Sequence, residues 1–466
     1  MEIVFLLNGA EVRLSVAARP DLATTTLLDW LRTERGLRGT KEGCNEGDCG
    51  ACSVMVTGSE DHPKALNACI LFMPQLHGKA VRTVEGIAAP DGTLHPVQDA
   101  MISEHGAQCG FCTPGFVVTM ATAHACGRTD HADQLAGNLC RCTGYAPIVR
   151  AARAAEAAPV PPWVRDTPPE VSSVPAATDG ESCVAPESAD ALAEWYAAHP
   201  DATLVAGATD VGLWVTKGMR ELRQTAFLHR CRDLQCIEYR EDGSLRIGAA
   251  VTLSEMQAPI ARRFPSFGEL IRRYGSVQVR NAATIGGNIA NGSPIGDGAP
   301  ALIALGARLH LRHGSIRRDI PLEDFFLEYG RQDRAPGEFV EAVEIPAQAD
   351  DLRCYKLSKR FDQDISAVCG CFVIRVSASQ VTEARIAFGG LAGIPKRAQH
   401  VEKALVGESW TGQTIERAKT AIAQDFAPID DMRASADYRA LAASHMLQRF
   451  FVEKSGARTN VLEVSL

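Results

Sequence analysis

The sequence has no run of about 18 apolar residues, the length that a membrane-spanning helix needs. Its first residues, MEIVFLLNGAEVRL, alternate apolar and polar side chains and lack the basic start and the small-residue cleavage site of an export signal. The expected location is therefore the cytoplasm, with no membrane contact. The net charge of −8 gives no excess of basic residues to neutralise phosphates, which argues against a nucleic-acid partner.

Several motifs of nucleotide binding and hydrolysis are also missing. No G-x-G-x-x-G follows a strand and no G-x-x-x-x-G-K-[ST] occurs, so the chain has neither a Rossmann fingerprint nor a Walker A loop. Any dinucleotide must be bound by another fold. The twelve histidines form no H-E-x-x-H motif or cluster, and no Ser-His-Asp pattern is present, so hydrolytic and metalloprotease activities lack support.

Cysteine, in contrast, is abundant and unevenly distributed. Nine of the 15 cysteines precede residue 143, and eight of these nine form two spaced groups. Because thiols stay reduced in the cytoplasm, metal binding is a better interpretation than disulfides. The six later cysteines show no ligand spacing and are expected to be buried structural thiols: Cys183, Cys231, Cys236, Cys354, Cys369 and Cys371.

The first group lies in and after the stretch KEGCNEGDCGAC, residues 41–52. Its spacing, C-x4-C-x2-C-x16-C, is that of a plant-type [2Fe-2S] site. Glycines at 43, 47 and 50 supply the unusual backbone angles that a tight loop around a cluster requires. The predicted ligands are Cys44, Cys49, Cys52 and Cys69.

The second group combines a C-x2-C in GAQCGFCTPGF with a C-x-C in AGNLCRCTGYAPI. The order helix, pair, helix, pair, helix predicts two helical hairpins that hold four thiolates between their ends. Zinc also accepts four cysteines, so this spacing alone leaves zinc and a cluster open. The neighbouring plant-type motif favours iron and sulfur, with Cys109, Cys112, Cys140 and Cys142 as ligands.

The length of 466 residues predicts several domains. Asn8-Gly9 between two alternating segments predicts a hairpin. Residues 300–350 predict strands and turns, and the last sixty residues predict helices. The expected organisation is a ferredoxin domain, a helical cluster domain, a Pro- and Ala-rich linker, a dinucleotide-binding domain and a C-terminal domain, at 1–86, 87–158, 159–187, 188–348 and 349–466.

Two glycine-containing stretches are candidates for dinucleotide contacts. The turn after Leu204-Val205 could present backbone N–H groups to a pyrophosphate, although such turns are commonly structural. Residues 281–298, NAATIGGNIANGSPIGDG, have five glycines and a single fixed charge at Asp297. A pair of ordinary glycine turns is the alternative. In the last helix, Tyr438, Leu441, Met446, Leu447 and Phe450 are expected to pack along one side.

Taken together, these motifs resemble the iron–sulfur and flavin subunits of the bacterial xanthine dehydrogenases, in the molybdenum hydroxylase family. The resemblance runs from EGCNEGDCGAC through AQCGFCTPGF and NLCRCTGYAPI to TIGGNIANGSPIGD and KLSKRFDQDISAV. It implies a multidomain α+β chain: a plant-type ferredoxin (β-grasp) domain, a helical [2Fe-2S] domain, a two-part FAD-binding domain of the vanillyl-alcohol-oxidase type and a C-terminal α+β domain. It also implies two [2Fe-2S] clusters on the eight cysteines.

The resemblance further implies the FAD contacts. Residues 204–211 would meet the pyrophosphate, residues of the second glycine-rich stretch the phosphate and ribose, and Lys356 the flavin side. The implied contacts are Leu204, Val205, Ala206, Gly207, Ala208, Thr209, Asp210, Val211, Tyr274, Thr284, Gly287, Asn288, Asp297, Val340 and Lys356. Tyr274 stands where relatives have an aromatic residue by the adenine, and Val340 is a weaker match. Gly207-Ala208 departs from relatives that carry a second glycine or an asparagine.

The function implied by the resemblance is electron transfer in a larger enzyme. A molybdopterin-binding large subunit would oxidise hypoxanthine and xanthine, and NAD would accept the electrons. The expected assembly is an (αβ)2 heterotetramer, because no molybdopterin-binding part is present in these 466 residues. The alternatives are an equivalent relay in an aldehyde or carbon monoxide dehydrogenase, or a non-catalytic metal-binding scaffold.

Overall fold

The computed structural model describes residues 1–59, 62–171 and 183–460. The chain forms two compact units, Met1–Asp233 with Gly275–Thr284, and Leu234–Tyr274 with Ile285–Leu466. Part of the predicted linker, residues 172–182, lies outside the described residues. These units group residues by contact, so the four boundaries between the predicted segments stay predictions.

The first unit begins with a mixed five-stranded sheet in the order β2-β1-β5-β3-β4. The predicted hairpin is confirmed, since Asn8 and Gly9 have φ values of 51° and 84°, which a tight two-residue turn requires. Strand β5 pairs parallel with β1 and antiparallel with β3. The elements of this part are β1 (Glu2–Leu7), β2 (Ala10–Ser15), α1 (Leu27–Thr33), β3 (Ser53–Thr57), β4 (Lys64–Asn67), the 3₁₀ helix η2 (Ala68–Ile70) and β5 (Ala80–Arg82).

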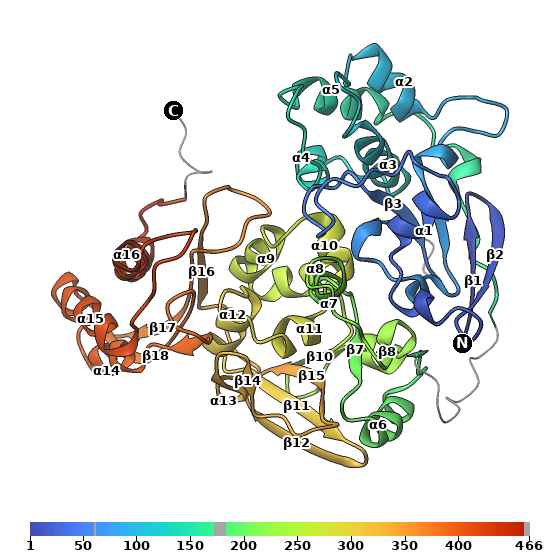
Figure 1. Ribbon diagram of the computed structural model, residues 1–466. Helices are drawn as coiled ribbons and strands as arrows, with labels where there is room; N and C mark the ends of the chain where they lie inside the picture. Colours follow the sequence, from blue (N-terminus) through green and yellow to red (C-terminus); the bar gives the residue numbers. More distant parts are fainter. Residues whose placement is uncertain (60–61, 172–182, 461–466) are drawn as a thin grey trace. The chain divides into compact units, whose positions relative to one another are not determined.

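Four helices follow in the first unit. Helix α2 packs on α5 and α3 packs on α4, and Figure 1 shows the four gathered together. Helices α2, α3 and α5 all carry proline in their first turn, where the missing N–H costs nothing. The predicted order of helices and cysteine pairs is confirmed, with one helix, α4, that was not predicted between α3 and the second pair. The helices are α2 (Pro96–Ser103), α3 (Thr113–Ala125), α4 (His131–Leu135) and α5 (Ala146–Ala155).

The described start of the predicted linker is fixed to the ferredoxin part rather than exposed as a free spacer. Arg82 forms a bidentate ion pair with Asp166, with distances of 2.6 and 2.7 Å, and the two side chains are only 10% and 7% exposed. Trp163 donates its indole N–H to the Ile87 carbonyl at 3.0 Å. Residues 159–171 therefore belong to the packed body of the first unit.

The rest of the first unit is a small parallel sheet in the order β6-β8-β7 with three helices. Helix α10 lies against β4, where the Asn281 amide donates to the Ala65 carbonyl at 3.0 Å. The elements are β6 (Cys183–Val184), α6 (Ala189–Ala198), β7 (Thr203–Val205), α7 (Val211–Thr216), β8 (Thr225–Phe227) and α10 (Val277–Ala282).

The second unit starts with an antiparallel sheet in the order β12-β11-β15-β10-β9. Helix α8 begins with a capping box in which the Thr252 hydroxyl and the Glu255 carboxylate each bond the other's backbone N–H. The elements are β9 (Ile237–Tyr239), β10 (Leu245–Gly248), α8 (Leu253–Arg263), α9 (Pro265–Arg272), α11 (Ile285–Ala290), α12 (Gly298–Ala304), β11 (Arg308–His313), β12 (Ile316–Pro321), α13 (Leu322–Phe325), β13 (Phe326–Glu328), β14 (Arg331–Gln332) and β15 (Phe339–Ile345).

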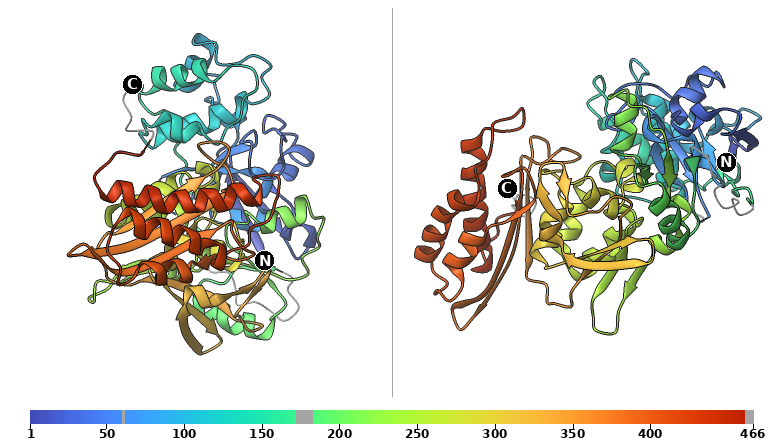
Figure 2. Two further views of the ribbon diagram at one scale, coloured as in Figure 1. Left: turned by 90° about the vertical axis from the view of Figure 1, so that its left-hand side faces the viewer. Right: turned by 60° about the horizontal axis from the view of Figure 1, so that its bottom comes forward.

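The second unit ends in an antiparallel sheet, β16-β17-β18-β19, with three helices on one face (Figure 2). Phe372, Phe388 and Phe450 join the sheet to the last helix in one apolar core. Tyr438 and Leu441 were expected in this core but are exposed. The elements are β16 (Leu352–Leu357), β17 (Val368–Ser377), β18 (Gln380–Gly389), β19 (Lys396–Arg397), α14 (Gln399–Leu405), α15 (Gly412–Asp425) and α16 (Ala436–Lys454).

Within the described ranges, 1–59, 62–171 and 183–460, no helix has both the length and the apolar character that a bilayer crossing requires.

Candidate functional site

The structure brings the four thiols of the first predicted set together. Cys44 and Cys49 lie in the loop before β3, Cys52 lies at its end, and Cys69 lies in the turn η2 that follows β4. The Cys44 thiol interacts with those of Cys49 and Cys69, and the Cys69 thiol also interacts with that of Cys52. Cys52 and Cys69 are buried, whereas Cys44 and Cys49 are half-buried.

Backbone N–H groups of this loop point at its sulfurs. The bonds, with N···S distances of 3.2 to 3.4 Å, are Gly47 N–H to Cys69, Asp48 and Cys49 N–H to Cys44, and Cys44 N–H to Cys49. The neighbouring thiols of Cys49 and Cys69, followed by the backbone amides of Cys49 and Glu46, lower the pKa of Cys44. The interaction of the Cys49 thiol with Cys44 raises the pKa of Cys49. Donors aimed at sulfur are a principal means of tuning an iron–sulfur cluster.

The glycines predicted for this loop have a steric role that the structure makes visible. A Cβ on Gly43 would lie 2.7 Å from the Cys49 sulfur, so a side chain there would occupy the space of the thiols. Gly47 and Gly50 have φ values of +81° and +69°, which favour glycine. Four thiols, sulfur-directed amides and glycines that leave space beside the sulfurs fit a [2Fe-2S] cluster.

The second predicted set also converges. The Cys109 thiol interacts with that of Cys142, and the Cys112 thiol interacts with that of Cys140. Burial, together with the bond to Cys140, raises the pKa of Cys112 to about 12. The pKa of Cys140 is lowered. Burial alone would raise this pKa, but hydrogen bonds from the hydroxyl and amide of Thr143 outweigh the effect of burial. This donor set fits a second all-cysteine cluster.

The two sets differ in exposure. Cys109 and Cys142 are exposed, and Phe111 and Tyr145 beside them are 48% and 39% exposed. Among the eight predicted ligands, Cys52 and Cys69 of the first set are buried. Across the described part of the chain, no group of three or more His, Cys, Asp or Glu side chains is arranged to hold a single metal ion.

The remaining thiols only partly match their expected structural role. Cys183, Cys231, Cys369 and Cys371 are buried, as predicted for packing residues, but Cys354 is half-buried and Cys236 is exposed. Burial raises the pKa of Cys126, whose thiol donates to the Pro63 carbonyl at 3.3 Å.

The first predicted FAD loop, residues 204–211, joins β7 to α7 in the first unit. Gly207 lies against the end of α10, where an added Cβ would be 1.8 Å from the Ala282 carbonyl oxygen. Ala208 has a φ of +57°, a conformation that favours glycine and asparagine. Ala208, where the sequence departs from its relatives, therefore has a backbone angle that favours the glycine or asparagine that those relatives carry.

We expect Gly207→Ala to destabilise the first unit by about 1–3 kcal/mol, because the methyl group must push the backbone of α10 away. Chemical denaturation of the purified chain measures this loss. Gly412→Ala is the control, since a Cβ there meets nothing within 4 Å and the residue lies at a helix start. Equal stability of the two variants would contradict the steric argument.

In the second unit, three predicted FAD residues line one pocket: Tyr274, Asn288 and Asp297, with an apolar wall from α8 and α9. The Asn288 amide donates to the Tyr274 hydroxyl at 3.2 Å. Its Oδ1 is buried and, among the described residues, has no hydrogen-bond partner. A buried acceptor at a mostly apolar pocket fits a bound polar ligand such as part of FAD.

In the second glycine-rich stretch, Ile285–Ala290 form a short helix, α11, whereas turns follow it at 291–296, with Gly292 at a φ of +64°. An added Cβ on Gly286 would lie 2.5 Å from that of Ala249, so this glycine allows α11 to approach the neighbouring backbone. Gly287 is on the exposed side of α11. Val340 lies buried in β15, opposite Leu311, and Thr284 is buried in the first unit.

Asp297 is not the isolated charge that the sequence suggested. Its carboxylate is 2.5 Å from the Lys356 ammonium, and these side chains are only 4% and 2% exposed. The Ser366 hydroxyl donates to the other carboxylate oxygen at 2.5 Å and accepts from Lys356 at 3.0 Å. Ser366 was not predicted, and the only signal for it was its place ten residues after Lys356, before a buried strand.

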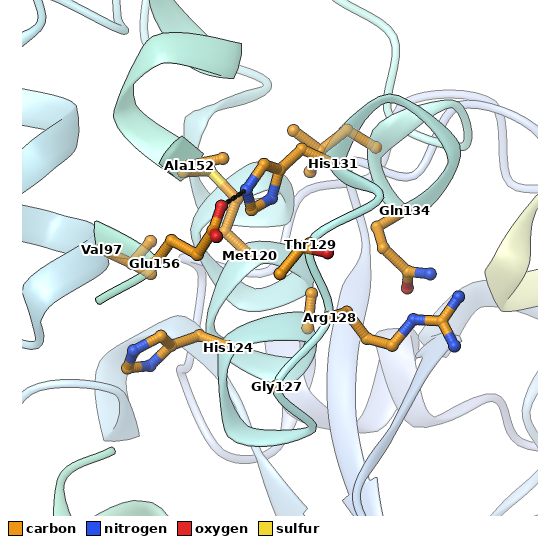
Figure 3. Close-up of a pocket in the computed structure, with 12 residues that line it drawn as sticks. Val97, Met120, His124, Gly127, Arg128, Thr129, His131, Gln134, Ala152 and Glu156 are labelled. Atoms are coloured by element: carbon orange, nitrogen blue, oxygen red, sulfur yellow. Dashed lines mark hydrogen bonds and ion pairs between the residues drawn. The ribbon is translucent and has the colours of Figure 1, made fainter. Parts of the chain in front are cut away.

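A pocket away from the predicted site residues lies among α2, α3, α4 and α5 (Figure 3). His131 and Glu156 approach each other across it, with Nε2 and Oε2 2.8 Å apart. Arg128 is paired with Asp130 by two hydrogen bonds of 2.8 and 2.6 Å. None of the predicted thiol or FAD residues lines this pocket.

Four protein-family models match consecutive parts of the chain. Residues 12–73 match a 2Fe-2S iron–sulfur cluster binding domain, and residues 83–153 match a [2Fe-2S] binding domain. Residues 178–348 match the FAD binding domain in molybdopterin dehydrogenase, and residues 353–454 match the CO dehydrogenase flavoprotein C-terminal domain. The chain belongs to the molybdenum hydroxylase family.

This molybdenum hydroxylase chain is similar to longer curated proteins. Xanthine dehydrogenase 2 of Arabidopsis thaliana is 30% identical over 91% of this chain, which spans 38% of that protein's length. The two [2Fe-2S] binding domains and the FAD binding domain confirm the predicted succession of domain types, and the resemblance stated from the motifs is confirmed with them.

Solved structures agree with the fold. Carbon monoxide dehydrogenase from Hydrogenophaga pseudoflava, in a form that lacks the Mo-pyranopterin moiety of its cofactor, has 27% identity and a TM-score of 0.54, covering 57% of this chain and 94% of that one. Quinoline 2-oxidoreductase from Pseudomonas putida 86 has 23% identity and a TM-score of 0.55, covering 59% and 96%. The second likeness concerns the fold alone.

Proposed function

We propose that this chain is the electron-transfer part of a xanthine dehydrogenase, in which electrons from purine oxidation pass through two [2Fe-2S] clusters and FAD to NAD. The carrying observation is that two complete four-thiol sets converge within one unit of the structure. The similarity to xanthine dehydrogenase 2 along nine-tenths of the chain supports purine oxidation as the reaction of the whole enzyme.

The proposed ligands are Cys44, Cys49, Cys52 and Cys69 for one cluster and Cys109, Cys112, Cys140 and Cys142 for the other. When bound, the clusters supply one-electron transfer, and FAD supplies the conversion between single electrons and a hydride. The exposed thiols of the second set support it as the entry point for electrons from another chain, since the first set is more buried.

Each unit by itself contains residues that are proposed to contact FAD. In the first unit, the loop 204–211 offers backbone N–H groups to the pyrophosphate, and Gly207 keeps the loop close to α10. In the second unit, Tyr274, Asn288 and Asp297 present the pocket's polar groups, and Asp297 is paired with Lys356. Thr284, Gly287 and Val340 are assigned only by their match to the family motif.

The proposed partner is a molybdopterin-binding subunit, assembled with this chain as an (αβ)2 heterotetramer in the cytoplasm. Support comes from the curated relatives, of whose length this chain spans 36% to 38%. The FAD binding model is itself that of a molybdopterin dehydrogenase. Purine binding and hydroxylation would take place on the partner.

We expect the purified chain to contain iron, acid-labile sulfide and FAD, and to oxidise NADH with an artificial dye, without turning over xanthine. Metal analysis, the absorption spectrum and the two assays test this. Co-purification from the native host should bring a molybdopterin-containing subunit. Zinc in place of iron, or the absence of a flavin band, would refute the redox function, and purine turnover by the chain alone would refute the partner.

A second candidate is the equivalent relay of a carbon monoxide dehydrogenase. The likeness to the Hydrogenophaga pseudoflava enzyme and the C-terminal family model favour it. The identity of the co-purified partner's substrate separates the two candidates: reduction of the clusters by carbon monoxide but not by xanthine would support the second.

A further inference from the structure

A buried network of amides and hydroxyls joins three parts of the first unit. Its centre is Gln278 of α10, which is fully buried. The Gln278 amide nitrogen lies 3.0 Å from Asn138 Oδ1 and 3.2 Å from the hydroxyls of Ser53 and Thr119. Ser53 directly follows the ligand Cys52, and Asn138 precedes the ligand Cys140 by two residues. The network therefore lies beside both cysteine loops.

Hydrogen bonding fixes the orientation of both amides. The Gly50 carbonyl can only accept, so the group facing it at 3.0 Å must be the Asn138 NH₂. Asn138 Oδ1 then faces Gln278, which must present its own NH₂ as donor. Gln278 Oε1 has no partner among the described residues. The network therefore depends on the NH₂ group of the Gln278 side chain, which donates all of its hydrogen bonds.

The same place is where the two cysteine loops touch through their backbones. The Leu139 N–H donates to the Cys49 carbonyl at 3.0 Å, so one hydrogen bond links residue 49, a ligand of the first set, to the residue before Cys140. A Cβ on Gly50 would lie 2.3 Å from the Gly137 carbonyl, and a Cβ on Gly137 would lie 2.2 Å from Gln278 Oε1. The glycines at 50 and 137 allow the two loops to approach each other closely, and the Gln278 side chain packs against Gly137.

Based on the proposed function, we propose that Gln278 is a positioning residue for electron transfer between the two clusters. Its amide holds Asn138 against Gly50 and so maintains the hydrogen bond from Leu139 to the Cys49 carbonyl. That bond provides a short covalent and hydrogen-bonded route from Cys49 to Cys140. Electron tunnelling falls steeply with distance and with each gap through space, so loosening this contact slows transfer without removing a ligand.

The test is Gln278→Leu in the full chain with its clusters, because leucine keeps much of the volume and removes the donor. We expect the Leu139 amide to exchange with deuterium about tenfold faster, and the magnetic splitting between the two reduced clusters in electron paramagnetic resonance spectra to shrink. Intercluster electron transfer, followed after rapid reduction, should slow by about tenfold. Iron content should not change.

Gln98→Leu is the matched control, since Gln98 caps α2 in the same unit through a 2.9 Å bond to the His95 N–H and takes no part in the network. Unchanged Leu139 exchange and unchanged splitting in Gln278→Leu would overturn the proposal. If Gln278→Leu does not fold, Thr119→Val tests the proposal instead, because it removes one hydrogen-bond acceptor of Gln278. Leu139 exchange and the magnetic splitting should then change in the same direction but by less. Absence of iron from the unmodified chain would refute the proposed function instead.

Discussion

Cys49→Ser is expected to remove the cluster of the first set while FAD stays bound. The serine oxygen is a harder and less readily ionised ligand than a thiolate, and it replaces a sulfur that receives the Cys44 N–H bond. Iron content should fall by half, and flavin reduction by electrons from the partner's substrate should fall at least about tenfold. Iron analysis and stopped-flow absorbance measure the two effects.

The matched control is Cys126→Ser. Cys126 belongs to neither set, and serine can retain its hydrogen bond to the Pro63 carbonyl. It should leave iron and flavin reduction unchanged. NADH oxidation with a dye should survive in Cys49→Ser, because that reaction needs FAD but not the first cluster. Normal flavin reduction by substrate in Cys49→Ser would show that the proposed order of centres is wrong.

The features that the sequence predicted depend on local spacing. The cysteine groups and the Asn8-Gly9 hairpin each follow from residues at most 33 positions apart, the span from Cys109 to Cys142. In α16, the predicted apolar face was partly wrong. Ala443, Met446, Leu447 and Phe450 are buried on an i, i+3, i+4, i+7 stripe, and Tyr438 and Leu441 do not fall on it.

The features that the sequence did not predict depend on distant contacts. Gln278 meets partners 140 to 225 positions away, and no local pattern marks it among other glutamines. Asp297 and Lys356 are 59 positions apart, so each was read as a single charge rather than as one buried pair. Gly286 and Gly287 signal a turn by composition, yet tertiary packing on Ala249 selects a helix.

Lys356→Met is expected to lower the free energy of unfolding of the second unit by about 3–5 kcal/mol, because it leaves the Asp297 carboxylate buried without its cation. The Ser366 hydroxyl alone cannot compensate a charge that is 4% exposed. Chemical denaturation followed by fluorescence measures the loss, and FAD content measured on the same samples shows whether the pocket is affected. Lys359→Met is the control, since Lys359 is an exposed lysine of the following loop.

The double variant Lys356→Met with Asp297→Leu separates a coupled pair from two independent stabilising residues. Removing both charges leaves only the Ser366 hydroxyl without partners, which costs about 1–3 kcal/mol. The double variant should therefore be more stable than Lys356→Met alone, although it loses more polar groups. Additive losses would contradict the coupling. Recovered stability with reduced FAD content would support a role for the pair in presenting Asp297 to the cofactor, beyond holding β16 and α12 together.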